Sequence, residues 1–246
     1  MYFHVIACQV FQRELSRLIA DSENVISVTW LPQGLHETPN MLTQRVAKAI
    51  DAFLSDVDSG NVKHLPDAFL LCYGLCSNGT IGLEAKRVPI VIPKTDDCIA
   101  LFLGSQGRYL ELFNEHSGTY WLNNGWIETS FLPADDAIER RKAAYAEQYG
   151  DDNAEYLIEQ EMQYLKNYHF CRYITSPVFL SAKNESAARS VADKWELEFI
   201  KEPGDLLLIK KLISGDWDEN EFVICPPGYV TAAAYDGSKI RAVPAK

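Results

Sequence analysis

The sequence predicts an α/β fold built on an open, mostly parallel sheet with helices on both faces. Two observations support this prediction. Strand-like segments that are apolar throughout, such as 68–73 and 88–92, alternate with helical patterns over the first hundred residues. The alternation returns near the C-terminus, after a charged helical region over 134–168. Fully apolar strands separated by helices are typical of parallel sheets covered on both faces, so we expect a Rossmann-like arrangement with a helical insertion in the middle.

The first half of the chain predicts four strands and the helices between them. A buried strand over 2–7 precedes a helix over 11–20, in which Phe11, Leu15 and Leu18 recur at helical spacing. A β-branched and aromatic strand over 24–31 ends at Pro32, and an amphipathic helix covers 40–53. We then expect a strand over 68–73, a short helix over 81–86 and a strand over 88–92.

The second half is less regular. A helix over 98–113 is interrupted by Gly104 and Gly107, and GTYWLNNGW (118–126) predicts two short β segments around an Asn-Asn-Gly turn. Gly150 divides the helical region. The expected later elements are the end of a strand at 179–180, a helix over 185–195, a strand over 197–200, an element over 205–213 and a last strand over 221–225.

These elements suggest three parts. We expect an α/β half over 1–133 that carries the functional site and a helical segment over 134–170. A second α/β part over 171–246 then completes the sheet or forms a small lobe.

Composition argues against several classes of function. A net charge of −11 disfavours binding to nucleic acids and to anionic membrane surfaces. The N-terminus MYFHVIACQVFQREL lacks the basic region of a signal peptide, and no stretch of about 20 apolar residues is present. Six cysteines without a CxxC motif are expected to be free thiols. We therefore expect a cytoplasmic protein with a small-molecule substrate and no nucleic-acid or membrane partner; the oligomeric state stays open.

Five of the six cysteines follow predicted strands. In an open parallel sheet, ligands bind beyond the carboxyl ends of the strands. His36 follows the second strand, and Cys171 stands apart and is expected in the core. The cysteines that follow strands are Cys8, Cys72, Cys76, Cys98 and Cys225.

Side chains at the ends of adjacent strands can converge on one metal ion. The preferred ligands are His36, Cys76 and Cys98, with Cys8 and Cys72 as rivals. Three protein ligands leave an open position, as in catalytic zinc sites, whereas thiolates alone also suit an iron–sulfur cluster. Zinc is therefore the expected cofactor and a cluster is the alternative. The alternative role for His36 is that of an exposed loop residue.

The stretch LLCYGLCSNGTIGLEAK (70–86) contains the candidate catalytic residue Cys76. If a helix begins just after it, the helix field lowers the pKa of the thiol. Gly74, Asn78 and Gly79 are candidate cofactor-binding residues, because a glycine-rich turn exposes backbone N–H groups to an anion. The turn matches neither Walker A nor GxGxxG. Asp97 is a candidate base, or the N-cap of a helix that begins near residue 98.

The segments IACQVFQREL, LPQGLH, YGLCSNGTIGL, VIPKTDDCIALFLGS and GTYWLNNGW together resemble the DUF1638 family, uncharacterised proteins of methanogens and other bacteria. The resemblance is dense over 1–130 and looser beyond. Where the family often has Arg-His before Asp-Cys, this chain has KTD at 94–96, so a ligand at that histidine would be missing here. The recurrent family positions are matched by Cys8, His36, Cys76, Asp97 and Cys98.

Genes of this family often lie beside those of corrinoid-dependent methyltransferases. The resemblance therefore implies a role in one-carbon or corrinoid methyl metabolism, as an enzyme acting on a small thiol or methylated metabolite, with a corrinoid protein or methyltransferase as a possible partner. The alternative is a non-catalytic metal, cluster or accessory protein that serves such a methyltransferase system.

Overall fold

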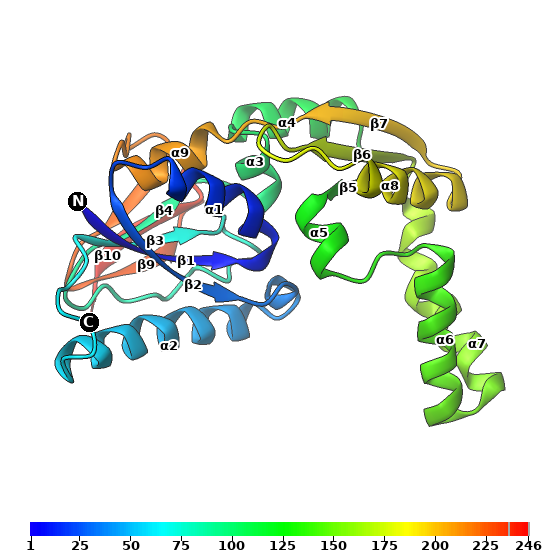
Figure 1. Ribbon diagram of the computed structural model, residues 1–246, viewed down its shortest axis with the longest axis horizontal. Coiled ribbons are helices and arrows are strands. Elements are labelled where there is room, and N and C mark those ends of the chain that lie inside the picture. The colour runs from blue at the N-terminus through cyan, green and yellow to red at the C-terminus, as the bar shows by residue number, and fades with distance from the viewer. Residues whose placement is uncertain (236, 246) are drawn as a thin grey trace. The chain divides into compact units, whose positions relative to one another are not determined.

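The chain forms two compact units, which the computed structural model describes over residues 1–235 and 237–245, with Asp135 described by its backbone alone. Unit 1 comprises Met1–Tyr109 and Asp205–Lys246, and unit 2 comprises Leu110–Gly204 (Figure 1). Because the chain leaves unit 1 and later returns to it, these units cut across the predicted boundaries at 133 and 170. Among the described residues, no helix is both long enough and apolar enough to cross a membrane.

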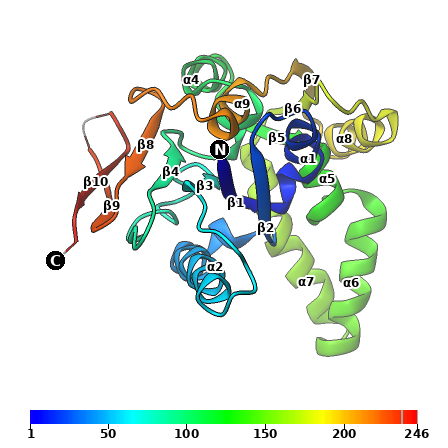
Figure 2. The same cartoon turned by 60° about the vertical axis from the view of Figure 1, so that its left-hand side comes forward.

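Unit 1 contains a five-stranded sheet. The strand order is β2 (Val25–Leu31), β1 (Tyr2–Cys8), β3 (Ala68–Cys72), β4 (Ile90–Pro93) and β8 (Phe222–Cys225), as Figure 2 shows. The first four strands are parallel, and β8 is antiparallel to β4. All residues of β3 and β4 are buried, as expected for central strands covered on both faces. The predicted α/β fold with a mostly parallel sheet is confirmed.

Helices cover both faces of this sheet (Figure 1). On one face lies α2 (Pro39–Asp58), which buries Leu42, Val46 and Ile50 at helical spacing. On the other face, α9 (Leu207–Ser214) packs against β3 and β4 and against α1 (Gln12–Ala20) and α3 (Cys98–Phe102). Two short 3-10 turns, η1 (Gln9–Phe11) and η2 (Leu35–Glu37), follow the first two strands. Helix α4 (Gln106–Glu115) begins in unit 1 and ends in unit 2.

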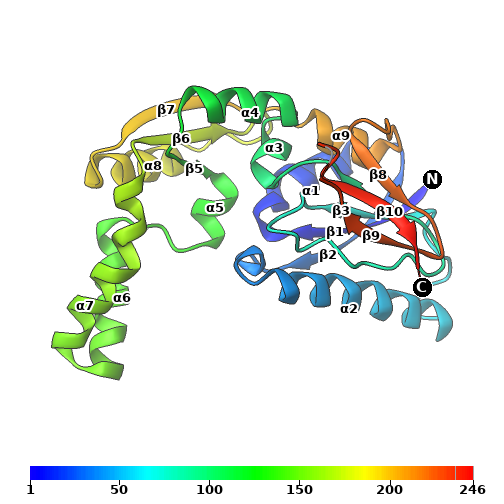
Figure 3. The same ribbon diagram turned by 180° about the vertical axis from the view of Figure 1, so that it is seen from behind.

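The predicted helix over 81–86 is wrong. Residues 76–82 form turns, and Glu84 makes a β-bridge to Val230. The backbone of this segment bonds to a C-terminal hairpin, β9 (Tyr229–Ala233) and β10 (Ile240–Pro244), which lies beside β8 (Figure 3). The hairpin lies beyond the last predicted strand at 221–225, because its small and turn-forming residues resemble a loop.

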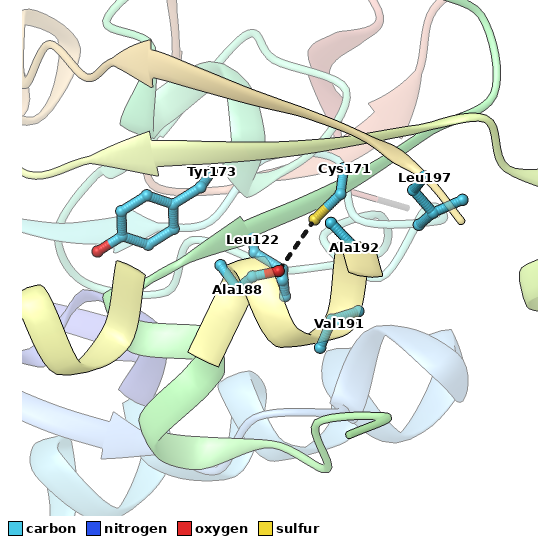
Figure 4. Packing of buried hydrophobic residues seen from close by; sticks show 7 residues of the cluster. All are labelled: Leu122, Cys171, Tyr173, Ala188, Val191, Ala192 and Leu197. Atoms are coloured by element: carbon cyan, nitrogen blue, oxygen red, sulfur yellow. Dashed lines mark hydrogen bonds between the residues drawn. The ribbon is translucent and has the colours of Figure 1, made fainter. Parts of the chain in front are cut away.

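Unit 2 contains a second, fully parallel sheet, in the order β5 (Thr119–Asn123), β6 (Phe170–Thr175) and β7 (Glu198–Pro203). Helix α8 (Ala182–Lys194) covers one face. The hydrophobic core between this helix and the sheet consists of Leu122, Cys171, Tyr173, Ala188, Val191, Ala192 and Leu197 (Figure 4). The Cys171 Sγ lies 3.7 Å from the Ala188 carbonyl oxygen, so the predicted core position of this cysteine is confirmed.

The helical insertion belongs to unit 2. It consists of α6 (Asp135–Tyr149), α7 (Asp151–Met162) and η3 (Gln163–Asn167), and Gly150 separates the first two helices as predicted. Two other expectations are wrong. The Asn-Asn-Gly sequence starts helix α5 (Asn124–Thr129) rather than a β turn, because the Asn123 side chain caps it. No strand ends at 179–180, because β6 stops at Thr175.

His4, in the middle of β1, is buried, with its ring nitrogens 2.7 Å from Ser27 Oγ and 2.9 Å from Thr29 Oγ1. Burial lowers the pKa of this imidazole from 6.5 to about 4. In the unfolded chain His4 takes up a proton once the pH falls below about 6.5. In the folded protein it stays neutral until the pH falls to about 4. We therefore expect the free energy of unfolding to fall by roughly 3 kcal/mol as the pH falls from about 6.5 to about 4.

Urea unfolding between pH 4 and 7 measures this effect. The variant His4→Gln keeps a hydrogen-bonding side chain but cannot titrate, so its stability should depend less steeply on pH. Equal pH slopes for the variant and the natural protein would show that His4 does not contribute.

Candidate thiol site at the sheet edge

Four cysteines lie at the carboxyl edge of the unit 1 sheet. Cys8 is the last residue of β1, Cys72 is the last residue of β3, and Cys76 follows in the next loop. Cys98 is the first residue of α3, in the connection that follows β4. The four thiols are free and, except for the partly exposed Cys98, buried.

Cys225 lies elsewhere, so the predicted grouping of five strand-end cysteines is wrong in this one member. It ends β8 and pairs with Ile90, the first residue of β4. Because β8 runs antiparallel to β4, its end lies at the amino edge of the parallel strands. The predicted grouping holds only if every strand of the sheet runs in the same direction.

The loops after β3 and β4 are joined through their backbones. The N–H of Leu75 donates to the Thr95 carbonyl (2.8 Å), and the N–H of Cys76 donates to the Asp96 carbonyl (2.9 Å). Gly74 permits this approach: a Cβ at this position would lie 2.6 Å from Thr95 Oγ1 and 2.8 Å from the Asp97 carbonyl oxygen. The packing of the two loops therefore brings Cys76 next to the segment that carries Cys98.

The thiols of Cys8 and Cys72 lie on opposite faces of the sheet. Ala7 pairs with Cys72, so these two side chains share a face, and Cys8, one residue further along β1, points to the other. Burial raises the pKa of Cys72, and the charges of Cys8, of Cys76 and of the buried Glu14 on α1 raise it further.

Burial raises the pKa of the Cys8 thiol, and the nearby Tyr73 hydroxyl lowers it. This buried hydroxyl makes no hydrogen bond with any of the described residues. Tyr73 was not among the predicted site residues; its place one residue after Cys72 puts it on the same face as Cys8.

Burial raises the pKa of each of the four thiols, for Cys76 to about 12. A second cause is mutual: the charges of Cys8 and Cys76 raise the pKa of Cys98, and the charge of Cys8 raises that of Cys76. The charge of Asp97 also raises the pKa of Cys76 and of Cys98. The prediction that a following helix lowers the pKa of Cys76 is wrong, because no helix follows it and desolvation dominates.

The turn after Cys76 has an unusual backbone. Cys76, Ser77 and Asn78 have φ angles of 46°, 58° and 69°, in the left-handed region. For residues other than glycine this conformation costs roughly 1–2 kcal/mol each. The turn closes with the Gly79 N–H donating to the Cys76 carbonyl (3.0 Å). Cys76 is buried, whereas Ser77 and Asn78 are exposed. The turn thus places one buried thiol directly before two polar residues that face solvent.

Asp97 fits the N-cap role that the sequence analysis gave as an alternative. Its Oδ1 accepts a hydrogen bond from the Ile99 N–H (2.8 Å), and its Oδ2 accepts one from the Tyr109 hydroxyl (3.3 Å). Burial raises the pKa of this carboxyl, while the hydrogen bonds from Ile99 and Tyr109 lower it. The neighbouring Asp96 forms an ion pair with Lys239 (2.5 Å) and accepts a hydrogen bond from Gln106 Nε2 (2.7 Å). A catalytic role for Asp97 stays a prediction.

His36 lies on η2 with its side chain exposed, unlike the buried thiols. Over residues 1–235 and 237–245, no group of three or more His, Cys, Asp or Glu side chains is arranged to hold a metal ion. The ligand roles of His36 and the cysteines, and the cofactor-binding roles of Gly74, Asn78 and Gly79, stay predictions.

The fold and the site define a class: an α/β protein with a cluster of buried, neutral thiols at the carboxyl edge of a mostly parallel sheet. The family model described as "Protein of unknown function (DUF1638)" matches residues 30–213. The match covers most of the chain, so this protein belongs to the DUF1638 family, in agreement with the resemblance. No curated protein and no solved structure matches it significantly.

Proposed function

We propose that the carboxyl edge of the unit 1 sheet binds a soft metal ion through Cys8, Cys76 and Cys98. The observation that supports this proposal is that the charged thiols raise one another's pKa, an effect that Cys72 shares through Cys8 and Cys76. Ionisation of one opposes ionisation of the others, and Asp97 adds a further negative charge. A cation bound among them would reverse this repulsion, and metal binding drives thiols to give up their protons.

Zinc is preferred to an iron–sulfur cluster because Cys8 and Cys72 lie on opposite faces of the sheet. A cluster usually takes four cysteines. The fourth candidate is Cys72, whose side chain lies on the face opposite to Cys8. Three thiolates suit zinc and leave one coordination position for another ligand. In this proposal Cys8 takes the place that the sequence analysis preferred for the exposed His36.

Metal binding requires a movement, because the three thiols are not already arranged around an ion. The turn over residues 76–78 is where we expect it. Three successive left-handed residues hold the backbone of Cys76 in a strained conformation, and Ser77 and Asn78 face solvent. A change at these residues moves the Cys76 thiol without disturbing the central strands.

We further propose that the protein is a cytoplasmic enzyme of one-carbon or corrinoid methyl metabolism, acting on a small thiol or methylated metabolite. Free cysteines suit a reducing compartment. In this proposal a ligand reaches the open position beside the partly exposed Cys98, and Asp97 accepts a proton from it. A corrinoid protein or methyltransferase is the proposed partner.

One observation favours the alternative, a non-catalytic metal or accessory protein: Cys8 and Cys76 are almost entirely buried. Cobalt(II) in place of zinc distinguishes the two, because thiolate-to-cobalt absorption reports the ligands. If adding 2-mercaptoethanol increases this absorption, the fourth position is open and the enzyme is favoured. An unchanged spectrum favours the accessory protein.

The metal itself is tested by anaerobic purification, elemental analysis and zinc titration. We expect about one zinc per chain. Because the thiols are protonated at neutral pH, binding should release protons, and raising the pH from 6 to 8 should strengthen it. With three protons released, the affinity rises by up to about a thousandfold per pH unit. Folded protein with no metal, or an affinity independent of pH, would contradict the proposal.

A further inference from the structure

Two buried side chains of unit 2 have N–H donors without a hydrogen-bond partner among the described residues. They are the Nδ2 of Asn123 and the Nε of Arg172. Each residue is only 2% exposed. A buried donor left unbonded costs roughly 1–3 kcal/mol, so such donors in a folded protein call for an explanation.

The two donors lie on the same face of the sheet. Arg172 on β6 pairs with Trp121 on β5, and Asn123 lies two residues further along β5. Side chains in this diagonal relation share a face, roughly 7–8 Å apart. This face is opposite to the one on which Cys171 and Tyr173 pack against α8 (Figure 4). The donors are therefore separate from the core of unit 2.

The remaining polar atoms of both residues are already bonded. Arg172 Nη1 donates to Glu202 Oε2 (2.5 Å), and Nη2 donates to His116 Nδ1 (2.6 Å), which must accept because a guanidinium only donates. The guanidinium also lies 5.5 Å from the centre of the Trp121 ring. Asn123 Oδ1 accepts from the Trp126 N–H (2.9 Å), which fixes the amide orientation and makes Nδ2 the unbonded end.

We propose that Asn123 and Arg172 bind a small metabolite through one of its oxygen atoms, in a site distinct from the thiol cluster. Only an acceptor satisfies two N–H donors, and carboxylate and carbonyl oxygens are the acceptors that metabolites commonly present. Asn123 is the last residue of β5 and so lies at the carboxyl edge of the sheet, where ligands bind in parallel α/β folds. This proposal does not depend on metal binding.

Side-chain NMR tests the site directly, because the Arg172 Nε–H and Asn123 Nδ2 signals can be observed in ¹⁵N-labelled protein and assigned with Arg172→Lys and Asn123→Asp. Sodium acetate and acetamide serve as probes. Saturable shifts of both signals with acetate indicate a carboxylate ligand, and shifts with acetamide indicate a neutral carbonyl. If neither probe moves the two signals, the site binds only ordered water and the proposal is overturned.

The variant Asn123→Asp provides the matched test. An aspartate keeps the acceptor that caps α5 but removes the amide donor and adds a negative charge. We expect the folded variant to lose at least tenfold in probe affinity, read at the Arg172 signal. Asn153→Asp makes the same change at an exposed position of α7 and should leave the affinity unchanged. Equal affinity in both variants would argue against a role for Asn123.

Discussion

Each of the variants Cys8→Ser, Cys76→Ser and Cys98→Ser should bind zinc more than about 100-fold more weakly than the natural protein while staying folded. A hydroxyl is a far weaker ligand than a thiolate, and even the loss of a residue that only supports a ligand costs about 10- to 100-fold in affinity. Anaerobic competition against a zinc-binding dye measures the change. The effect should be similar at the three positions, because all three thiols are proposed to bind the same ion.

Cys225→Ser is the matched control. Like Cys8, Cys225 is buried and ends a strand, but it lies at the opposite edge of the same sheet. Its substitution should leave zinc affinity unchanged, as should Cys171→Ser in the core of unit 2. His36→Ala separates the two ligand sets: a tenfold or greater loss would restore His36 as a ligand. Full affinity in Cys8→Ser would remove Cys8 from the site.

Sequence patterns predicted the central elements of the fold and failed where long-range pairing decides the structure. The apolar runs of β1, β3 and β4 predict that these strands are buried. The helical spacing of Leu42, Val46 and Ile50 predicts α2. The direction of β8 carries no such local signal. Residues 81–86 have helical spacing, yet hydrogen bonds between residues 82–85 and the C-terminal hairpin hold this segment out of a helix.

The candidate site was predictable to a similar degree. The ends of parallel strands meet at one edge, so the positions of Cys8, Cys72, Cys76 and Cys98 could be inferred from strand assignments alone. Which face each thiol occupies depends on register, which the sequence did not specify. The raised pKa of Cys76 depends on burial by distant segments. The role of Gly74 depends on the approach of another loop.

Gly74→Ala should destabilise the protein by about 2–3 kcal/mol and weaken zinc binding at the same time. The added Cβ would lie 2.6 Å from Thr95 Oγ1 and 2.8 Å from the Asp97 carbonyl oxygen, and the second of these atoms belongs to the backbone. Overpacking of this kind costs roughly 1–3 kcal/mol, and the loops after β3 and β4 must separate to relieve it. Their separation displaces Cys76 from Cys98. Urea unfolding and zinc titration of the same preparation measure the two effects.

Gly107→Ala is the control for the loss of a glycine. Gly107 is in α4, where a Cβ would meet nothing closer than 3.5 Å, and alanine in a helix is more stable than glycine by up to about 1 kcal/mol. We therefore expect this variant to be at least as stable as the natural protein, with unchanged zinc affinity. If Gly74→Ala bound zinc normally despite its loss of stability, the contact between the two loops would serve folding alone. The thiols of Cys76 and Cys98 would then not need the close approach that Gly74 permits.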